Sequence, residues 1–197
     1  MKNLEKYLSL LGEESDGLLL TSRYSRFYGT EYDIAEGVAI VTKNGCRYFT
    51  DSRYIESAQN GIKDFEVLMV DRQNPYSKRL NDAIADFGVE TLGYEENYLT
   101  VAELLHYQDS LHVKLIPMNR KINGFRSVKE PWELELMRKA QEITDKAFSD
   151  VLTKIKAGMT EKEVQTELIY CLYKNGADNL ALIPLLSQAL RPACLTV

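Results

Sequence analysis

The chain has 197 residues, of which 45% are hydrophobic and 27% charged, and its formal net charge at pH 7 is −5. This acidic balance argues against a nucleic-acid binder, because phosphate contacts require a basic face. No apolar run is long enough to span a bilayer, and the first residues lack the apolar stretch of a signal peptide, so we expect a cytoplasmic protein that binds no membrane.

The first part of the chain, residues 1–123, alternates short helices with short strands. Leu4, Leu8 and Leu11 recur at helical spacing, and Gly12 can end that helix. Further helices are predicted at 51–58, 76–87 and 100–110. Strands are predicted at 18–21, 37–42, 47–50, 65–70, 91–94 and 112–117. The order indicates an α/β domain with a mixed sheet and helices on its faces.

Local turn and cap chemistry supports these elements. Asn44-Gly45 is the preferred pair for a tight hairpin, whose two central residues need positive φ. Thr100 and Glu103 predict a capping box at the start of a helix. Asp51 is placed to cap the helix that follows it, while Glu95-Glu96, like Glu13-Glu14, is expected in an exposed loop.

The second part consists of two long amphipathic helices. The first begins near Pro131, which suits a first helical turn, and ends by Gly158. A capping box at Thr160 and Glu163 begins the second, and Gly176 stands where a left-handed C-cap belongs. The apolar stripes of the two helices are Leu136, Ala140, Ile143, Ala147, Val151 and Ile155, and Val164, Leu168 and Leu172.

These stripes need a sheet to cover them, and little strand pattern follows. We therefore expect a domain at 1–123, a linker at 124–130, two helices of a second domain at 131–180, and a tail of different character at 181–197. Because exposed apolar stripes seek partners, we also expect a homo-oligomer.

Cysteine and histidine usage offers little for catalysis. The chain has three cysteines, Cys46, Cys171 and Cys194. Their odd number and the lack of C-x-x-C spacing favour a reduced, cytosolic protein. His106 and His112, the only histidines, are far from any ligand-like cluster and fit surface or strand positions better than a metal site.

Three stretches carry a family resemblance. They are Thr-Ser-Arg-Tyr-Ser-Arg-Phe-Tyr-Gly at 21–29, Tyr-Phe-Thr-Asp-Ser-Arg-Tyr at 48–54, and residues 126–140 followed by Gly-x-Thr-Glu at 158–161. In this order and spacing they resemble the Xaa-Pro aminopeptidases and dipeptidases, metallopeptidases of the creatinase or pita-bread class. The match at 28–30 is partial, because the family pattern Tyr-x-x-Gly-Phe is replaced by Tyr-Gly-Thr. The resemblance extends to about Leu180.

The resemblance implies a creatinase-type, ribonuclease H-like N-terminal domain and the first two helices of an incomplete pita-bread α+β domain. Intact relatives are hydrolases that cleave the bond before proline in peptide substrates. They use two divalent metal ions (manganese, cobalt or zinc) held by two Asp, one His and two Glu. Those ligands lie downstream of the helix that ends at Gly176. We therefore expect a truncated chain without catalytic residues, metal ligands or cofactor, and without activity of its own.

The resemblance also implies that the loop 28–36 borders the substrate pocket of a neighbouring subunit. The candidate border residues are Tyr28, Tyr32, Arg53 and Tyr54. The residues themselves allow a plainer interpretation, in which the tyrosines pack in a half-buried sheet and loop. Asp51 and Arg53 form a candidate acid–base pair, but a structural ion pair explains their spacing better.

The tail does not resemble the family as written. One permitted codon string for residues 181–197, after insertion of a single base in its second codon, reads Ala-Phe-Asp-Pro-Ile-Val-Val-Ser-Gly-Pro-Lys-Thr-Ser-Leu-Pro-His-Gly. This shifted amino-acid sequence is similar to the corresponding segment of the family. We therefore hypothesise a frameshift near Leu182, which sequencing of codons 180–197 tests. The alternative is a short protein whose tail packs on the second helix.

Two other function classes stay open. A non-catalytic peptide- or protein-interaction module has the same fold without metal ligands. A nuclease of the ribonuclease H type has a similar mixed sheet, but it needs clustered acids and a basic face, which this chain lacks. Metal-dependent hydrolysis of a Xaa-Pro dipeptide separates the peptidase from both.

Overall fold

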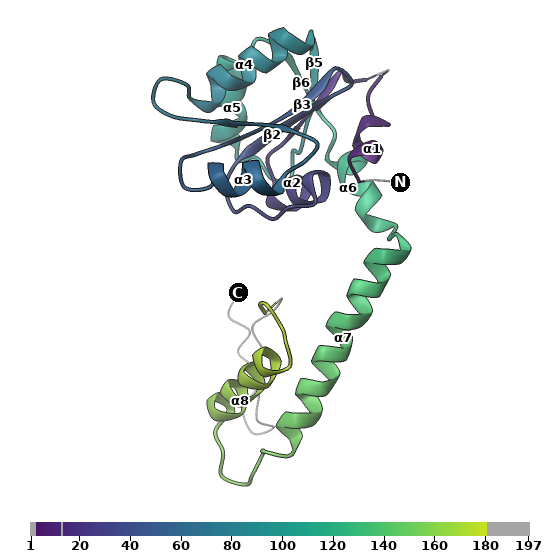
Figure 1. The fold of residues 1–197 in the computed structure, drawn as a ribbon, viewed down its shortest axis with the longest axis vertical. Coiled ribbons are helices and arrows are strands. Elements are labelled where there is room, and N and C mark those ends of the chain that lie inside the picture. The colour runs from purple at the N-terminus through teal and green to yellow at the C-terminus, as the bar shows by residue number, and fades with distance from the viewer. Residues whose placement is uncertain (1–2, 13, 181–197) are drawn as a thin grey trace. The chain divides into compact units, whose positions relative to one another are not determined.

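The computed structural model describes residues 3–12 and 14–180. The chain forms two compact units, Met1–Val128 and Lys129–Val197 (Figure 1). The first unit contains α1 (Asn3–Leu8), β1 (Gly17–Leu20), α2 (Arg23–Thr30), β2 (Val38–Thr42), β3 (Gly45–Thr50), α3 (Ile55–Gly61), β4 (Glu66–Met69), α4 (Tyr76–Phe87), β5 (Thr91–Tyr94), α5 (Val101–Ser110), β6 (Lys114–Pro117) and α6 (Asn119–Ser127). The second contains α7 (Pro131–Leu152) and α8 (Glu161–Lys174).

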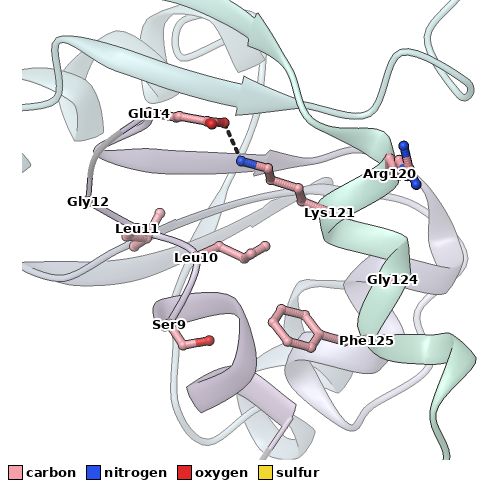
Figure 2. A pocket seen from close by; sticks show the side chains of 9 residues that line it. All are labelled: Ser9, Leu10, Leu11, Gly12, Glu14, Arg120, Lys121, Gly124 and Phe125. Atoms are coloured by element: carbon pink, nitrogen blue, oxygen red, sulfur yellow. Dashed lines mark hydrogen bonds and ion pairs between the residues drawn. The ribbon is translucent and has the colours of Figure 1, made fainter.

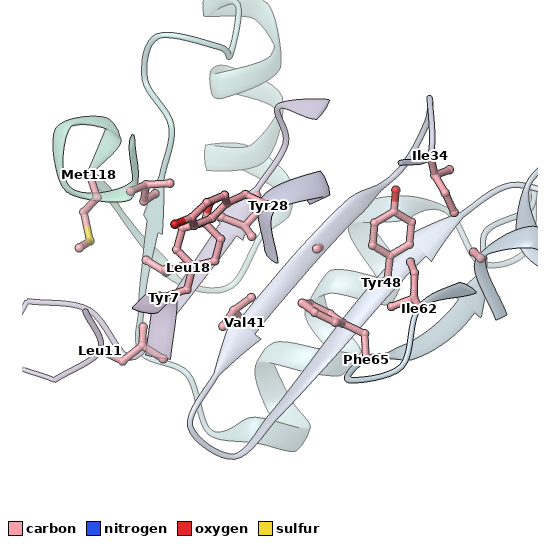
Figure 3. Close-up of a cluster of buried hydrophobic side chains, with 14 residues drawn as sticks. Tyr7, Leu11, Leu18, Tyr28, Ile34, Val41, Tyr48, Ile62, Phe65 and Met118 are labelled. Atoms are coloured by element: carbon pink, nitrogen blue, oxygen red, sulfur yellow. The ribbon is translucent and has the colours of Figure 1, made fainter. Parts of the chain in front are cut away.

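The first unit is built on a six-stranded mixed sheet in the order β4-β3-β2-β1-β5-β6. Strand β2 runs antiparallel to both β1 and β3, and the other neighbours are parallel. Successive side chains of a strand face opposite sides, so Leu18 and Leu20 enter one core and Leu19 the other. Helices α1, α2, α3 and α6 contribute to the first core (Figure 3), and α4 and α5 to the second. The predicted α/β fold with a mixed, helix-flanked sheet is confirmed.

Helix α2 was not predicted, because its stretch was interpreted as an entrance loop. Its N-cap Ser22 accepts a hydrogen bond from the backbone N–H of Ser25. Its C-cap Glu31 has a left-handed φ of 56°, and the Glu31 N–H bonds the carbonyl of Phe27. Gly29 lets α2 approach α1, since a Cβ there would lie 3.1 Å from the Tyr7 ring. Caps at both ends and close packing against α1 therefore support this helix.

The predicted hairpin exists, but its turn lies one residue earlier than expected. Thr42 pairs with Gly45, so Lys43 and Asn44 are the central residues, and Asn44 does not have positive φ. The Thr42 hydroxyl accepts hydrogen bonds from the N–H groups of Asn44 and Gly45 at 3.2 and 3.0 Å. This side chain closes the turn in place of the predicted Asn-Gly geometry.

The first unit extends beyond the boundary expected at residue 123. Helix α6, which was not predicted, runs through that position to Ser127, and the unit ends at Val128. Ile122 on this helix is fully buried in the first core. Residues 124–127 therefore belong to a helix packed on the sheet rather than to a linker.

The edge strand β4 is partly covered along its outer side. The carbonyl of Val67 accepts a hydrogen bond from Gln59 Nε2 at 3.5 Å, and the carbonyl of Met69 accepts one from Arg79 Nε at 3.1 Å. The two donors come from α3 and α4, which flank the strand. Side chains thus occupy backbone acceptors that an edge strand otherwise leaves open.

The second unit is a pair of helices in contact, with a small buried cluster of Ala147, Val151 and Cys171. Both predicted capping boxes of α5 and α8 are present. Gly176 has a φ of 100°, and the N–H of Ala177 bonds the carbonyl of Leu172, which is the predicted left-handed helix end. Helix α7 ends at Leu152, earlier than the expected limit at Gly158.

Candidate functional site

The candidate border residues do not lie together at one surface. Tyr28 is a core residue with 7% of its surface exposed. Its ring meets that of Tyr7 edge-on at 5.7 Å, and its hydroxyl accepts a hydrogen bond from Lys6 Nζ at 3.0 Å. Tyr28 therefore holds α1 against α2 instead of facing solvent at a pocket.

The other three candidates lie on two neighbouring connections, α2–β2 and β3–α3. The Tyr32 hydroxyl is 3.0 Å from Ser57 Oγ on α3, and its ring covers Gly61, where a Cβ would approach within 2.4 Å. The Arg53 guanidinium lies 5.1 Å from the centre of the Tyr54 ring. Helix α3 thus brings Tyr32 into the same region of the fold as Arg53 and Tyr54.

Asp51 and Arg53 form a structural pair. The Asp51 carboxylate accepts hydrogen bonds from the backbone N–H of Arg53 at 2.9 Å and from its Nη2 at 2.6 Å. The Arg53 side chain lowers the pKa of the Asp51 carboxyl from its ordinary value. Asp51 does not cap α3 through its side chain, contrary to prediction, because the N-cap is Tyr54. Instead its carboxylate closes a turn that precedes the helix.

Arg26, which carried no role in the sequence interpretation, holds the α2–β2 connection in place. Only 5% of this residue is exposed. Its guanidinium donates to the carbonyls of Ile34 at 3.2 Å and Ala35 at 3.0 Å, and to the Tyr48 hydroxyl at 2.7 Å. Its Nε donates to the Thr21 carbonyl at 3.3 Å. One buried cation therefore ties the connection to β1 and β3.

Glu95 is also buried, which corrects the expectation of an exposed loop position. It is 0% exposed and lies just beyond β5. Its carboxylate accepts hydrogen bonds from the backbone N–H groups of Thr21 and Ser22 at 3.0 and 3.1 Å. The hydroxyls of Ser22 and Ser25 donate to it at 2.8 and 2.5 Å. The negative charge sits at the N-terminus of α2, where a helix favours an anion.

Two phenols near β3, those of Tyr48 and Tyr76, do not act as bases near neutral pH. Burial, reinforced by the negative charge of Asp51, raises the pKa of Tyr76 to about 12. Burial also raises the pKa of Tyr48, although the Arg26 cation opposes that shift. Both phenols keep their protons at neutral pH, which leaves hydrogen bonding and packing as their roles here.

Metal-ligand geometry is absent from the part of the chain that the structure describes. No three His, Cys, Asp or Glu side chains among residues 3–12 and 14–180 are grouped so that they could hold an ion. The same residues contain no helix of the length and apolarity required to cross a membrane.

Comparisons with known proteins match both units. Residues 2–128 match the Creatinase/Prolidase N-terminal domain, and residues 135–194 match Metallopeptidase family M24. The uncharacterized peptidase YqhT of Bacillus subtilis is 29% identical over 190 residues, which cover 95% of this chain and 53% of that protein. The chain therefore spans about half the length of this relative.

Solved structures give the same result. A Xaa-Pro dipeptidase from Bacillus anthracis is similar with a TM-score of 0.82 and 27% identity, over 89% of this chain and 49% of that one. A X-Pro aminopeptidase from Thermotoga maritima is similar with a TM-score of 0.82 and 26% identity, over 91% and 51% of the two chains.

The M24 match runs to residue 194 and so includes most of the tail that was expected to be foreign to the family. The match gives no support to that expectation. Residues 181–197 lie outside the described residues, and the frameshift near Leu182 stays a hypothesis.

The M24 family implies metal ions, but the described residues do not fit them, since no ligand group is present. With its complete N-terminal sheet and the matches across both units, the chain belongs to the creatinase/prolidase family of Xaa-Pro peptidases.

Proposed function

We propose that this chain serves as the N-terminal part of a proline-specific peptidase that cleaves the bond before proline. The observation that carries the proposal is the match of residues 2–128 to the Creatinase/Prolidase N-terminal domain, which coincides with a compact unit that has its own sheet and two cores. Relatives named Xaa-Pro dipeptidase and X-Pro aminopeptidase support the substrate class.

Within such an enzyme, we propose that Tyr32, Arg53 and Tyr54 border the substrate pocket of a neighbouring subunit. Their support is positional: the Arg53 side chain is 65% exposed and lies over the Tyr54 ring, and the Tyr32 hydroxyl contacts Ser57 on α3. Tyr28 contributes indirectly, because it packs α2, the helix that precedes the α2–β2 connection, against α1.

We also propose that the chain has no peptidase activity by itself. Two divalent ions, manganese, cobalt or zinc, supply a nucleophilic water and charge stabilisation in metallopeptidases of this kind. The described residues offer no group of ligands for them. The purified chain is therefore expected to give no hydrolysis of a Xaa-Pro dipeptide with added manganese or cobalt. Turnover that persists through repurification and is lost with a chelator would contradict this expectation.

A chimera tests the positive role of the first unit. Residues 1–128 would replace the corresponding domain of the Bacillus anthracis dipeptidase, which is structurally similar to this chain. If Arg53 contacts substrate, Arg53→Met should raise KM roughly three- to ten-fold with little change in kcat, because an exposed polar contact contributes about 0.5–1.5 kcal/mol of binding.

The matched control in the chimera is Arg72→Met, which removes an exposed arginine from the β4–α4 connection. An unchanged KM in the Arg53 variant, with an active chimera, would remove Arg53 from the pocket border. An active chimera also separates the peptidase proposal from the alternative of a non-catalytic peptide- or protein-interaction module.

Self-association is the final part of the proposal. Large apolar side chains on α7 and α8 are exposed, among them Leu136 at 56% and Leu152 at 55%. Exposed apolar patches of this kind favour association. Sedimentation velocity at tens of micromolar is expected to give a dimer or larger species.

The double variant Leu136→Lys/Leu152→Lys should shift that equilibrium toward monomer, while Val101→Lys on the exposed face of α5 should not. A wild-type chain that stays monomeric and binds no hydrophobic dye would refute the association.

A further inference from the structure

Four asparagines of this chain are followed directly by glycine, at 44–45, 60–61, 123–124 and 175–176. Asparagine is a chemically labile residue. The backbone nitrogen of the next residue can attack its side-chain carbonyl carbon, and the two groups are held close by the chain itself. A following glycine leaves that nitrogen unshielded by a side chain. The four pairs are therefore candidate sites of covalent modification, and the structure places them in different environments.

Three of the four pairs belong to helices. The pair at 60–61 ends α3. The pair at 123–124 lies inside α6, the helix that forms one side of the cavity near the end of α1 (Figure 2). The pair at 175–176 follows α8 as its cap, and Nδ2 of Asn175 donates to Asp150 Oδ2 and to the Cys171 carbonyl, both at 2.9 Å. Helical hydrogen bonds hold the backbone of such pairs, so the nitrogen reaches the side chain only after local opening.

The fourth pair lies outside the helices, at the tip of the β2–β3 hairpin. Asn44 is exposed and is a central residue of the turn. The Thr42 hydroxyl oxygen accepts hydrogen bonds from the N–H groups of both Asn44 and Gly45. Nδ2 of Asn44 donates to the Phe87 carbonyl at 2.8 Å. Two local contacts, rather than a helix, thus restrain this pair.

The packing of the hairpin on α4 favours glycine at position 45. A Cβ there would lie 2.6 Å from the Phe87 ring, which also lies 4.7 Å from the Arg47 guanidinium. A larger residue would force the ring to move. The contact between the hairpin and the end of α4 therefore uses the same glycine that makes Asn44 reactive.

We propose that Asn44 is the site at which the folded protein undergoes spontaneous deamidation. The Gly45 nitrogen attacks the Asn44 side-chain carbonyl carbon and loses its proton, ammonia leaves, and a cyclic succinimide forms between the two residues. Water then opens the ring at either carbonyl, which gives aspartate or isoaspartate at position 44. The net reaction consumes water, releases ammonia and changes no oxidation state. It stands independently of the proposed peptidase function.

The product disturbs the contact between the hairpin and α4. The amide donor that bonds the Phe87 carbonyl is replaced by a carboxylate, which only accepts hydrogen bonds when ionised. Phe87 is the last residue of α4, where a helix presents its negative end. Isoaspartate also lengthens the backbone of the turn, which strains the pairing of Thr42 with Gly45. Deamidation therefore loosens the hairpin from α4.

The test compares the four pairs within the intact chain. The protein is incubated at mildly alkaline pH and digested with a protease that cleaves after glutamate, which places the four asparagines in different peptides. In the folded chain, a mass gain of about 1 Da is expected first in the peptide with Asn44, at a rate roughly ten-fold or more above the helical pairs. In urea the four pairs are expected to react at similar rates, because they share one dipeptide sequence.

An earlier mass gain at a helical pair of the folded chain would overturn the proposal. So would an unchanged Asn44 in the folded chain under conditions in which the chain in urea reacts. Both outcomes are read from the wild-type protein, so neither depends on whether a variant folds.

Variants test the role of the turn. Thr42→Val keeps the side-chain shape but removes the hydroxyl, and should raise the Asn44 rate roughly two- to ten-fold. Thr50→Val is the matched control, because it removes a buried hydroxyl at the other end of the hairpin, where Thr50 bonds the Glu36 carbonyl at 2.9 Å. Equal rates in the two variants would refute a local brace. Asn44→Asp reproduces one product and should speed hydrogen exchange at the end of α4, and unchanged exchange there would refute the loosening.

Discussion

Replacement of Glu95 by alanine is expected to lower the free energy of unfolding of the first unit by about 3–5 kcal/mol, a large share of an ordinary domain's stability. The carboxylate is fully buried and accepts four hydrogen bonds. Alanine leaves the N–H groups of Thr21 and Ser22 without their acceptor and removes the anion from the start of α2. Urea unfolding followed by circular dichroism measures the loss.

Two further variants separate the effect of the buried network from the general effect of removing a carboxylate. Glu95→Gln retains the shape and one acceptor oxygen, but its amide NH₂ faces donors, so an intermediate loss of about 1–3 kcal/mol is expected. Glu90→Ala removes an exposed carboxylate close by in sequence and should change stability by less than about 0.5 kcal/mol. Equal losses for Glu95→Ala and Glu90→Ala would show that the buried network contributes nothing specific.

Arg26→Met is expected to cost about 2–4 kcal/mol and to loosen the α2–β2 connection selectively. Methionine fills similar space, but it leaves the carbonyls of Ile34 and Ala35 and the Tyr48 hydroxyl without their donor. Hydrogen exchange followed by mass spectrometry should show that the exchange rate increases over the wild-type rate more in residues 31–37 than in α4. Helix α4 lies on the other face of the sheet and serves as the internal reference.

Arg26→Lys keeps the charge but cannot reproduce the forked geometry, so it should fall between the wild type and Arg26→Met. Arg72→Met is the control, because Arg72 is an exposed arginine on the β4–α4 connection, outside residues 31–37. A uniform increase in exchange across the first unit would indicate general destabilisation and would contradict a specific clamp on residues 31–37.

The elements predicted correctly from the sequence have short-range signals. Helix α4 begins at Tyr76 and ends before a left-handed Gly88, and the Thr100–Glu103 capping box begins α5, as the local residues indicate. Capping and glycine termini act over a few residues, so they can be recognised without knowing the fold. The mixed sheet follows from the order of such elements.

The features that were missed depend on contacts between distant segments. Helix α2 is rich in aromatic residues and contains Gly29, which makes sense only beside the ring of Tyr7. The burial of Glu95 depends on donors at Thr21 and Ser22, more than 70 positions earlier in the chain. The cavity between α1 and α6 joins segments that are still farther apart. No local sequence pattern predicts such contacts, because they form only when the tertiary fold brings the distant segments together.

The covered edge strand has a consequence for how copies of this protein can associate. Gln59 and Arg79 already occupy the outward carbonyls of Val67 and Met69. A second β4 strand would have to displace both side chains before it could extend the sheet, and this hinders strand addition and fibril growth from that end. Association through this edge of the sheet is therefore disfavoured, and Gln59→Ala/Arg79→Ala is expected to expose backbone acceptors to which a further strand can add.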